Sequence, residues 1–406
     1  MISLAAAQAI LKQCLDAHRP VIRTLSIEEA VGYVCARDIH AQREHPAFDY
    51  SAMDGFALDV RDVLPNVSAE RPSVLTVVGE VAAGRSHERP WAPATCVRIM
   101  TGAPLPAGAN AVVPWEQASV ADSRITLQRP VDQGQHIRRA GEDFKLRERL
   151  VTQGSVFNPL HAGVLATAGV HEVEIYVKPT VGFLTVGDEL QDRNAQGPMI
   201  INSNRHFIAQ SLAYAGYASD CVPAPADHPD RIRTALVAML EQSDMVITTG
   251  GLSEGTYDYL PKVLNEISAD VLIRKVSIKP GKPFTFSKWK GKYIFSLPGN
   301  PGAVVALLYT LVIPFLNGMA RRNGNLRQVS VHLETAYANR HDRDEILFVL
   351  PERRREEWFL AQLPQLNSGS VGLLASARGW WQVPAQTIFA CGDQVTVTLF
   401  PWNIHS

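Results

Sequence analysis

The sequence has few cysteines, and none of them lie in a cluster. Five occur among 406 residues without a Cys-x-x-Cys pair, at positions Cys14, Cys35, Cys96, Cys221 and Cys391. An odd, scattered set of this kind argues against a disulfide framework and against a cysteine-ligated zinc site. It is typical of reduced thiols in a cytoplasm.

The sequence also lacks a strong net charge and any segment typical of membrane targeting. Its formal net charge is −1, so no global field attracts nucleic acid or anionic membranes. No run approaches the ~20 apolar residues of a membrane span, and residues 1–18 lack the basic start and cleavage site of a signal peptide. They predict an amphipathic helix with Ser3 as N-cap. We therefore expect a cytoplasmic protein that binds neither a membrane nor nucleic acid.

Length and patterning predict several domains. A chain of 406 residues, 46% apolar and 19% charged, is globular and too long for one hydrophobic core. Residues 1–175 start with the helix and continue as short alternating stretches broken by Gly and Pro, which predicts a β-rich region. Residues 176–322 alternate strand and helix patterns, and residues 323–406 predict a small β domain. The expected fold class is multidomain α/β with a central three-layer α/β domain.

The central region predicts a mainly parallel sheet between helix layers. Residues 181–186 form a continuous apolar run, typical of a strand covered on both faces. A helix capped by Ser203 or Asn204 follows, and a later helix begins at Pro229. Ligands of such sheets bind beyond the carboxyl ends of the strands. The loops at those ends are residues 186–192, 223–230, 250–258 and 297–302.

These loops gather acidic side chains. The set, with one histidine, is Asp188, Glu189, Asp227, His228, Glu254 and Asp258. So many carboxylates do not suit an anion pocket unless a cation or a proton transfer is involved.

The loop after residue 249 indicates a phosphate or pterin pocket. Gly250, Gly251 and Gly255 have no Cβ atoms, so backbone amides can point at an anion, and Ser253 can add a hydroxyl. The loop is not a P-loop, because no Gly-Lys-Ser/Thr follows it. A glycine loop after a strand is weak evidence when it stands alone.

A basic stretch strengthens the same interpretation. Residues 274–292 contain seven basic residues and no acidic one. Lys279 and Lys282 stand in this stretch between prolines, where they suit phosphate or an oxyanion. The alternative is a solvated basic hairpin without a ligand.

Three unusual loops occur in the β-rich N-terminal region. Residues 46–58 place Asp49 and Asp54 ahead of an apolar strand, although an Asp-Gly pair alone is a common turn. Residues 99–116 form a loop with few large side chains, which lets a ligand approach backbone N–H groups. Residues 134–145 combine adjacent arginines with adjacent acidic residues. Together the three loops favour a ligand site.

The motifs of these loops resemble one family in their order along the chain. They are SAMDG (51–55), MTGAPLP (100–106), RRAGEDF (138–144), VGDEL (186–190), INSN (201–204), ITTGGLSEGTYDY (247–259), IKPGKPF (278–284) and LPGNPGA (297–303). The series is similar to that of the MoeA-like molybdopterin molybdenumtransferases, which include the gephyrin E domain. No single motif is specific, but the ordered series is.

The resemblance implies an activity and an assembly. The family inserts molybdenum from molybdate into adenylylated molybdopterin (molybdopterin-AMP) with a divalent cation such as Mg²⁺, and it releases AMP. It has a MogA-like central α/β domain and works as a homodimer with sites at the subunit interface. Molybdopterin adenylyltransferase and recipient molybdoenzymes are the further partners that the resemblance suggests.

The resemblance also implies roles for individual residues. The expected catalytic residues are Asp54, Thr101, Asp143, Glu189 and Asp258. The expected metal ligands are Glu189, Asp227 and Asp258. Substrate binding falls to Gly250, Gly251, Ser253, Gly255, Lys275, Lys279, Lys282, Pro298 and Asn300.

Several positions depart from the family pattern. Glu254 replaces a small apolar residue, His228 replaces the second of two acidic residues, and Arg378 replaces a small polar residue. The segment 341–355 replaces a Gly-Arg-x-x-Phe-x-Arg-like motif. Two alternatives therefore stay open: a non-catalytic or specialised paralogue that binds molybdopterin, the finished cofactor or a partner on the same fold, and a metal-dependent phosphohydrolase or nucleotidyltransferase.

Overall fold

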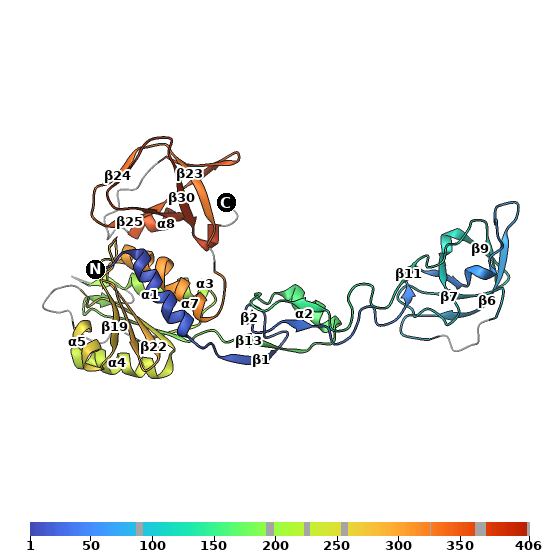
Figure 1. Cartoon of the computed structure of the whole chain (residues 1–406), viewed down its shortest axis with the longest axis horizontal. Coiled ribbons are helices and arrows are strands. Elements are labelled where there is room, and N and C mark those ends of the chain that lie inside the picture. Colours follow the sequence, from blue (N-terminus) through green and yellow to red (C-terminus); the bar gives the residue numbers. More distant parts are fainter. Residues whose placement is uncertain are drawn as a thin grey trace. The chain divides into compact units, whose positions relative to one another are not determined.

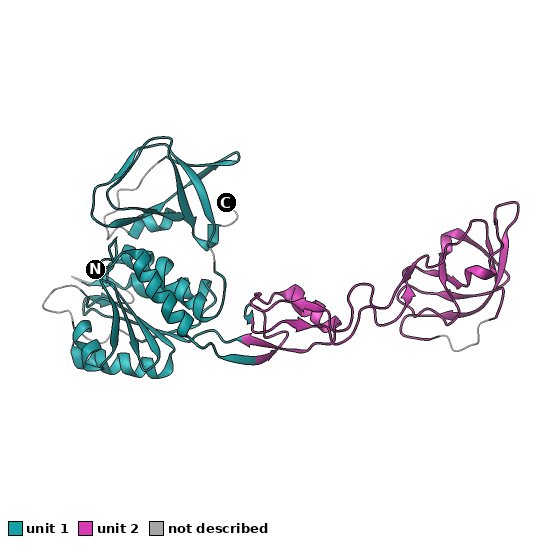
Figure 2. Ribbon diagram, viewed as in Figure 1, with its two compact units in different colours: residues 1–23, 32–34, 176–406 teal, residues 24–31, 35–175 magenta. Residues whose placement is uncertain are grey.

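The computed structural model describes residues 1–86, 92–191, 199–222, 228–252, 259–324, 326–361 and 371–403. The chain divides into two compact units (Figure 2). Unit 1 comprises residues 1–23, 32–34 and 176–406, and unit 2 comprises residues 24–31 and 35–175. The strands β1 (Ile22–Ser26), β2 (Val34–Cys35) and β13 (Glu172–Tyr176) lie where the chain passes from one unit to the other.

Unit 2 is built mainly of strands, as its alternating sequence predicts. Its six-stranded sheet has the order β8-β5-β7-β6-β10-β9. The bounds are β5 (Gly55–Leu58), β6 (Ser73–Val81), β7 (Thr95–Ile99), β8 (Ala111–Pro114), β9 (Ala118–Ala121) and β10 (Arg124–Leu127). Alternate residues of β5 enter different hydrophobic clusters, Phe56 and Leu58 one and Ala57 another. Both faces of this sheet are therefore packed.

Shorter elements complete unit 2. Two ladders of two strands each form between β3 and β12 and between β4 and β11. The bounds are β3 (Ile39–His40), β4 (Tyr50–Ser51), η1 (Val60–Asp62), η2 (Trp115–Gln117), β11 (Ile137–Arg138), β12 (Arg149–Val151) and α2 (Pro159–Thr167). These short ladders hold the long loops that the sequence placed in this region.

The central sheet of unit 1 is mainly parallel, which confirms the prediction. Its order is β17-β14-β18-β22-β21-β19, and only β21 runs antiparallel to its neighbours. The bounds are β14 (Val181–Thr185), β17 (Ser219–Val222), β18 (Met245–Thr249), β19 (Asp270–Arg274), β21 (Thr285–Trp289) and β22 (Lys292–Leu297). A further short ladder joins β15 (Leu190–Gln191) and β16 (Ile200–Ile201).

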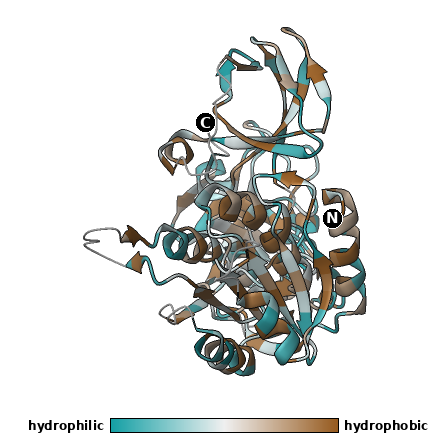
Figure 3. Cartoon of the chain, turned by 90° about the vertical axis from the view of Figure 1, so that its left-hand side faces the viewer, coloured by the Kyte–Doolittle hydropathy of each residue, from teal (hydrophilic) through white to brown (hydrophobic). Residues whose placement is uncertain are grey.

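Helices cover both faces of this sheet, which gives the expected three layers (Figure 1). One hydrophobic cluster joins the sheet to α1 (Leu4–Ala17), α3 (Ser203–Tyr214), α6 (Pro301–Leu307) and α7 (Ile313–Met319). A second cluster joins the other face to α4 (Pro229–Gln242) and α5 (Leu260–Glu266). Figure 3 shows hydrophobic residues on the inner helices and a mixture of residue types along α1, beside the N label.

The starts of two helices test the predicted caps. Ser3 caps α1, as expected, and its side chain accepts from the N–H of Ala6. The cap of α3 is Asn202, so the prediction of Ser203 or Asn204 is wrong. The side-chain oxygen of Asn202 accepts from the N–H of Arg205 at 3.2 Å. The extended chain therefore ends one residue earlier than the sequence pattern suggested.

The helical segment Pro301–Met319 corrects a second expectation. It is 19 residues long and apolar enough, by length and composition, to cross a membrane. It runs through α6, the π-helical η3 (Leu308–Val312) and α7. Since 78% of its most apolar stretch is buried inside the protein, it is a core helix of unit 1. This apolar run was not identified from the sequence, and it packs inside unit 1.

The C-terminal strands form a second sheet in unit 1. Its order is β20-β25-β28-β30-β23-β27-β26. The bounds are β20 (Ile278–Lys279), β23 (Gln328–Leu333), β25 (Asp344–Val349), β26 (Glu352–Arg354), β27 (Glu357–Leu360), β28 (Gly379–Val383) and β30 (Gln394–Leu399). A small ladder of β24 (Tyr337–Asn339) and β29 (Thr387–Phe389), the helix α8 (Val371–Ser376) and the turn η4 (Pro401–Asn403) complete it.

The C-terminal sheet contains one strand from the central region. β20 pairs in parallel with β25, and this pairing sets Lys279 beside Glu345. Side chains of the C-terminal strands, among them Ile346 and Phe348, also belong to the hydrophobic cluster of the central domain. The two regions of unit 1 therefore share both a strand pairing and a core.

Candidate functional site

Asp54 and Thr101 meet in unit 2. The carboxylate of Asp54 accepts from the backbone N–H of Thr101 at 2.7 Å and from its hydroxyl at 2.9 Å. These bonds, the backbone one foremost, hold the pKa of Asp54 below its ordinary value. Both residues are exposed to solvent. The pair therefore presents an ionised carboxylate, fixed in direction, at the surface.

A close backbone approach explains the glycine that follows Asp54. Gly55 begins β5 and stands opposite Pro114 of β8 and Ile99 of β7. A Cβ on Gly55 would overlap the carbonyl oxygen of Val113. Only glycine lets β5 enter the sheet here, and Asp54 consequently lies directly before the start of β5, beside residue 101.

The three unusual loops of unit 2 converge, and we refer to residues 46–58, 99–116 and 134–145 as the N-terminal loop cluster. Ser51 exchanges backbone hydrogen bonds with Gly102 and Ala103, at 2.8 and 3.0 Å. The strands β4 and β11 tie Tyr50 and Ser51 to residues 137–138. The structure therefore brings together the SAMDG, MTGAPLP and RRAGEDF motifs.

Asp49 organises the third of these loops. Its carboxylate accepts from the N–H of Ala140 at 2.8 Å and pairs with Arg139 at 2.6 Å. The bond from Ala140 contributes most to holding the pKa of Asp49 below its ordinary value. Asp49 is not among the site residues predicted from the sequence, where its place in the same loop as Asp54 is the only signal for it.

Asp143 lies at the far end of this turn and is exposed. Its backbone N–H donates to the carbonyl of His45 at 3.1 Å. The neighbouring Glu142 accepts from the N–H of Arg139 at 2.8 Å and pairs with Arg138 at 2.9 Å. The two acidic neighbours therefore differ: Glu142 is engaged within the loop, and the carboxylate of Asp143 faces solvent.

In unit 1, the glycine turn after β18 lies beside the LPGNPG loop. The N–H of Gly250 donates to the carbonyl of Leu297 at 3.1 Å. Gly250 has φ +86°, and a Cβ there would overlap the carbonyl oxygen of Val186. The backbone of three loops therefore approaches closely at the carboxyl ends of β14, β18 and β22.

Buried polar side chains form a layer beneath these loops. Asn202 donates to the hydroxyl of Thr185 at 2.8 Å, and Asn204 donates to the carbonyl of Gly299 at 2.7 Å. Within the described residues, the side-chain oxygens of Asn204 and Thr249 are buried without a hydrogen-bond partner. These asparagines belong to the INSN motif, but the sequence predicts no role for them. Asparagines directly after a buried strand were the available signal.

Lys279 has strong partners in the C-terminal sheet. Its ammonium lies 3.0 Å from the carboxylate of Glu345 and 2.7 Å from Nε2 of His341. Sequence reasoning missed both residues, because they fall in the segment 341–355 that departs from the family motif. The structure thus joins a candidate binding lysine to the C-terminal domain.

The other described candidates in unit 1 differ in their exposure. Glu189 and Lys282 are exposed, Lys275 and Gly251 are partly exposed, and Pro298 is buried. The side chain of Asn300 caps α6 by accepting from the N–H of Gly302 at 3.2 Å. Asn300 therefore caps a helix, a structural role that the sequence alone did not distinguish from the predicted role in ligand binding.

Some predicted residues lie outside the described part of the chain. They are Asp227, Ser253, Gly255 and Asp258, together with Glu254. Within the described part, no group of three or more His, Cys, Asp or Glu side chains is arranged to hold a metal ion. Of the predicted metal ligands, the structure describes only Glu189.

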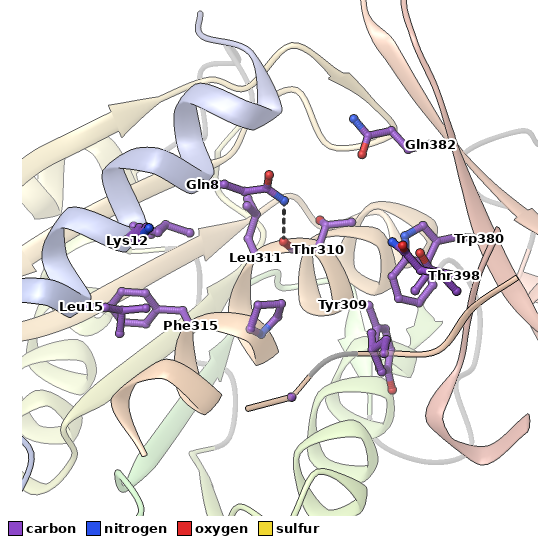
Figure 4. A pocket seen from close by; sticks show the side chains of 15 residues that line it. Gln8, Lys12, Leu15, Tyr309, Thr310, Leu311, Phe315, Trp380, Gln382 and Thr398 are labelled. Carbon is purple, nitrogen blue, oxygen red and sulfur yellow. Dashed lines mark hydrogen bonds between the residues drawn. The ribbon is translucent and has the colours of Figure 1, made fainter. Parts of the chain in front are cut away.

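A separate hollow of about 740 Å³ lies in unit 1 (Figure 4). Side chains of α1, the core helix and the C-terminal sheet line it, including Lys12, Tyr309 and Gln382. Across it, the amide of Gln8 donates to the carbonyl of Thr310 at 3.5 Å. None of the sequence-predicted site residues lines this hollow.

Known proteins resemble the chain along most of its length. Residues 2–169 match the profile of the MoeA N-terminal region (domain I and II), and residues 182–318 match that of a probable molybdopterin binding domain. The molybdopterin molybdenumtransferase of Haemophilus influenzae is 35% identical over 295 residues, which cover 72% of this chain and 71% of the relative. That of Staphylococcus aureus strain N315 is 34% identical over 316 residues, which cover 77% and 74%.

A solved structure resembles the whole fold. A molybdopterin biosynthesis moeA protein from Pyrococcus horikoshii OT3 covers 98% of this chain and 100% of its own, with a TM-score of 0.78 and 24% identity. At this identity the likeness shows the fold alone. The multidomain α/β architecture predicted from the sequence is confirmed by this match.

Proposed function

Because the chain belongs to the molybdopterin molybdenumtransferase family, we propose that it inserts molybdenum from molybdate into molybdopterin-AMP and releases AMP. It is a transferase of molybdenum cofactor biosynthesis. The observation that carries the proposal is the contact between Asp54 and Thr101, which joins two of the motifs on which the family resemblance rests. The adenylylated form of the substrate and the release of AMP belong to the proposal.

The N-terminal loop cluster supplies charge that suits a hydrolytic step. Release of AMP hydrolyses the phosphoanhydride bond: the oxygen of a water molecule bonds to phosphorus as the bridging P–O bond breaks, which gives AMP and the molybdopterin phosphate. An ionised carboxylate such as Asp54 can orient the attacking oxygen and accept its proton. Thr101 keeps this carboxylate ionised and directed, since both of its hydrogen bonds favour the charged form. Asp143 adds a second exposed carboxylate.

Unit 1 supplies groups that suit a diphosphate and an oxyanion. We assign the turn at Gly250 and Gly251 to the pterin phosphate, together with Ser253 and Gly255 beyond the described residues. The N–H of Gly250 is bonded to the carbonyl of Leu297, so Gly250 would shape the turn and would not itself donate to the phosphate. Lys275, Lys279 and Lys282 would bind molybdate or the diphosphate as point charges. Pro298 and Asn300 would shape the adjoining loop.

Carboxylate oxygens are the ligands that Mg²⁺ prefers. Glu189, Asp227 and Asp258 would supply such oxygens, and Glu189 is exposed in the loop that follows β14, where a ligand can reach it. When bound, Mg²⁺ would neutralise charge on the diphosphate. We assign the ion to these three residues by their chemistry.

We also propose a cytoplasmic homodimer. The family resemblance suggests that each site takes residues from both subunits, and it suggests molybdopterin adenylyltransferase and recipient molybdoenzymes as partners. Light scattering of the full chain is the direct test, with twice the mass of one chain as the expected result. A monomer at the concentrations of the activity assay would overturn this part.

The activity itself is tested by reconstitution. The purified chain is incubated with molybdopterin-AMP, Mg²⁺ and molybdate, and two products are followed: free AMP, and the activity of an added apo-molybdoenzyme. Both should appear, and both should need molybdate. Tight binding of molybdopterin-AMP without either product would support the non-catalytic paralogue instead.

A further inference from the structure

Lys279 and Glu345 are neighbours because of strand pairing. β20 and β25 run in parallel, and these two residues are partners in the register, as are Ile278 and Asp344. Side chains at paired positions leave a sheet on the same face. The ammonium and the carboxylate consequently meet at 3.0 Å, although they are far apart in sequence.

The carboxylate of Glu345 is held from its other side as well. Only 7% of its side chain is exposed, compared with 39% for Lys279. Its second oxygen accepts from the hydroxyl of Tyr337 at 2.7 Å. A buried carboxylate needs such partners, because an unpaired charge is costly in the interior. Glu345 is therefore the fixed member of the pair and Lys279 the adaptable one.

The second partner of Lys279 also stands on a rigid turn. Asn339 is 1% exposed, and its side chain accepts from the N–H of His341 at 3.0 Å. The same amide donates to the carbonyl oxygens of Arg343, Val383 and Pro384. The ring of His341 is thereby placed where its Nε2 lies 2.7 Å from the ammonium of Lys279.

The ammonium of Lys279 retains capacity for a ligand. An ammonium group has three hydrogens and no lone pair, so it donates to Glu345 and to Nε2 of His341. Within the described residues, these are the two recorded partners of Lys279. One hydrogen is left for an external acceptor, and the partial exposure of the side chain gives an anion access to it.

We propose that Glu345 is a positioning residue for anion binding: it holds the ammonium of Lys279 in one direction, so that the C-terminal sheet orients a substrate-binding group of the central domain. This inference rests on the proposed function, in which Lys279 binds molybdate or the diphosphate. A free lysine side chain loses rotational entropy when it binds an anion. Glu345 and His341 restrict that freedom beforehand, which favours binding.

The test compares Glu345→Gln, Lys279→Met and the double variant in the full chain. The molybdate KM and kcat for AMP release are measured, together with the Kd for molybdate alone by titration calorimetry. Glu345→Gln should raise both molybdate constants about tenfold, which corresponds to ~1.4 kcal/mol, and should leave kcat within about twofold. Because Glu345 acts through Lys279, the double variant should be no worse than Lys279→Met.

Two further variants guard against a loss of folding. Tyr337→Phe keeps the ring and removes the hydroxyl that fixes Glu345. It should raise the molybdate KM about threefold, which is less than the full effect of losing one charge-assisted hydrogen bond. Glu334→Gln is the matched control, because Glu334 pairs with Arg354 in the same domain at 2.5 Å, away from Lys279. Its molybdate KM should equal that of the wild-type chain.

The outcomes separate this inference from the proposed function. No AMP release by the wild-type chain would overturn the proposed function and, with it, this inference. Wild-type turnover with an unchanged molybdate KM in folded Glu345→Gln and Tyr337→Phe would overturn the positioning role alone. Additive losses in the double variant would also overturn it, since Glu345 would then act independently of Lys279.

Discussion

The N-terminal loop cluster of unit 2 and the lysine segment of unit 1 (residues 275–284) fix their charged groups in different ways. In the loop cluster, Asp54 is exposed and is held by the backbone and hydroxyl of Thr101. In the lysine segment, Lys279 is held by a buried carboxylate on the neighbouring strand β25, which comes from the C-terminal region. The first arrangement uses neighbouring loops of one small sheet, and the second requires two regions to fold together.

The two arrangements should respond differently when the charged group is replaced. A carboxylate held by exposed loop contacts contributes little to stability, so its replacement should affect chemistry and leave the fold intact. A lysine that neutralises a buried carboxylate contributes both to ligand binding and to the stability of the fold. Its replacement leaves Glu345 unpaired, and a stability loss should accompany the loss of binding.

The largest effect should come from the backbone that supports the loop cluster. Gly55→Ala places a methyl group against the carbonyl of Val113, and we expect it to lower the free energy of unfolding of unit 2 by about 3 kcal/mol. Urea denaturation followed by tryptophan fluorescence measures this. Gly163→Ala in α2 is the control, because nothing lies within 4 Å of its added methyl; it should be neutral or stabilise. Equal effects would show that β5 tolerates a side chain.

The chemistry of the loop cluster is tested by Asp54→Asn. We expect AMP release to fall at least tenfold, or ~1.4 kcal/mol of barrier, with a thermal midpoint within a few degrees of wild type. Asp258→Asn, which lies outside the described residues, should behave alike. The control is Asp122→Asn at an exposed turn with φ 45°, a conformation that asparagine also adopts. A normal rate in both site variants would remove these residues from the mechanism.

The lysine segment should respond through binding. We expect Lys279→Ala to weaken molybdate binding about tenfold, no less than Glu345→Gln, because Glu345 acts through Lys279. The loss should be largest at low salt because screening is weakest there. Lys290→Ala is the matched control from the same basic stretch; its ammonium lies over the ring of Trp289, 4.5 Å from the centroid. Titrations at two salt concentrations measure both variants. Unchanged binding in Lys279→Ala would restore the alternative of a solvated hairpin.

The smallest effect concerns protonation of Asp54. Because Thr101 lowers the pKa of Asp54, the carboxylate stays ionised to lower pH than an ordinary aspartate, and activity should be lost only as the pH falls through that lowered pKa. Thr101→Val removes one of the two hydrogen bonds and should move the acid limb of the pH–rate profile to higher pH. Thr101→Ser keeps the hydroxyl and should leave the limb in place. If the acid limb does not move in Thr101→Val, the limb does not report the protonation of Asp54.

Much of the fold could be predicted because local patterns determine it. The apolar run at residues 181–186 is β14, a buried strand of the parallel sheet, and Pro229 starts α4 as its ring geometry favours. The cap of α3 was placed wrongly since three polar residues in succession can all serve as caps. The segment Pro301–Met319 was overlooked as an apolar run, although its length and composition match those of a spanning helix.

The candidate site was predictable only where its contacts follow motifs. Asp54 and Thr101 belong to two motifs of the family series, and the structure places them in contact. Glu345 and His341 could not be found, because they reach Lys279 through a pairing between β20 and β25 that no local pattern encodes. The buried side-chain oxygen of Asn204 could not be predicted for a similar reason, since its burial depends on the packing of α3 against the LPGNPG loop.

We propose that the loop cluster and the lysine segment serve one reaction. It is tested most directly by single-turnover release of AMP from molybdopterin-AMP while molybdate is titrated, in the wild-type chain, Asp54→Asn and Lys279→Ala. We expect molybdate-dependent release by the wild type. Asp54→Asn should lower the rate at saturating molybdate, and Lys279→Ala should raise the molybdate concentration needed for the half-maximal rate. If either variant released AMP at the wild-type rate and with the wild-type dependence on molybdate, the shared reaction would be contradicted. The absence of AMP release by the wild-type chain would contradict it as well.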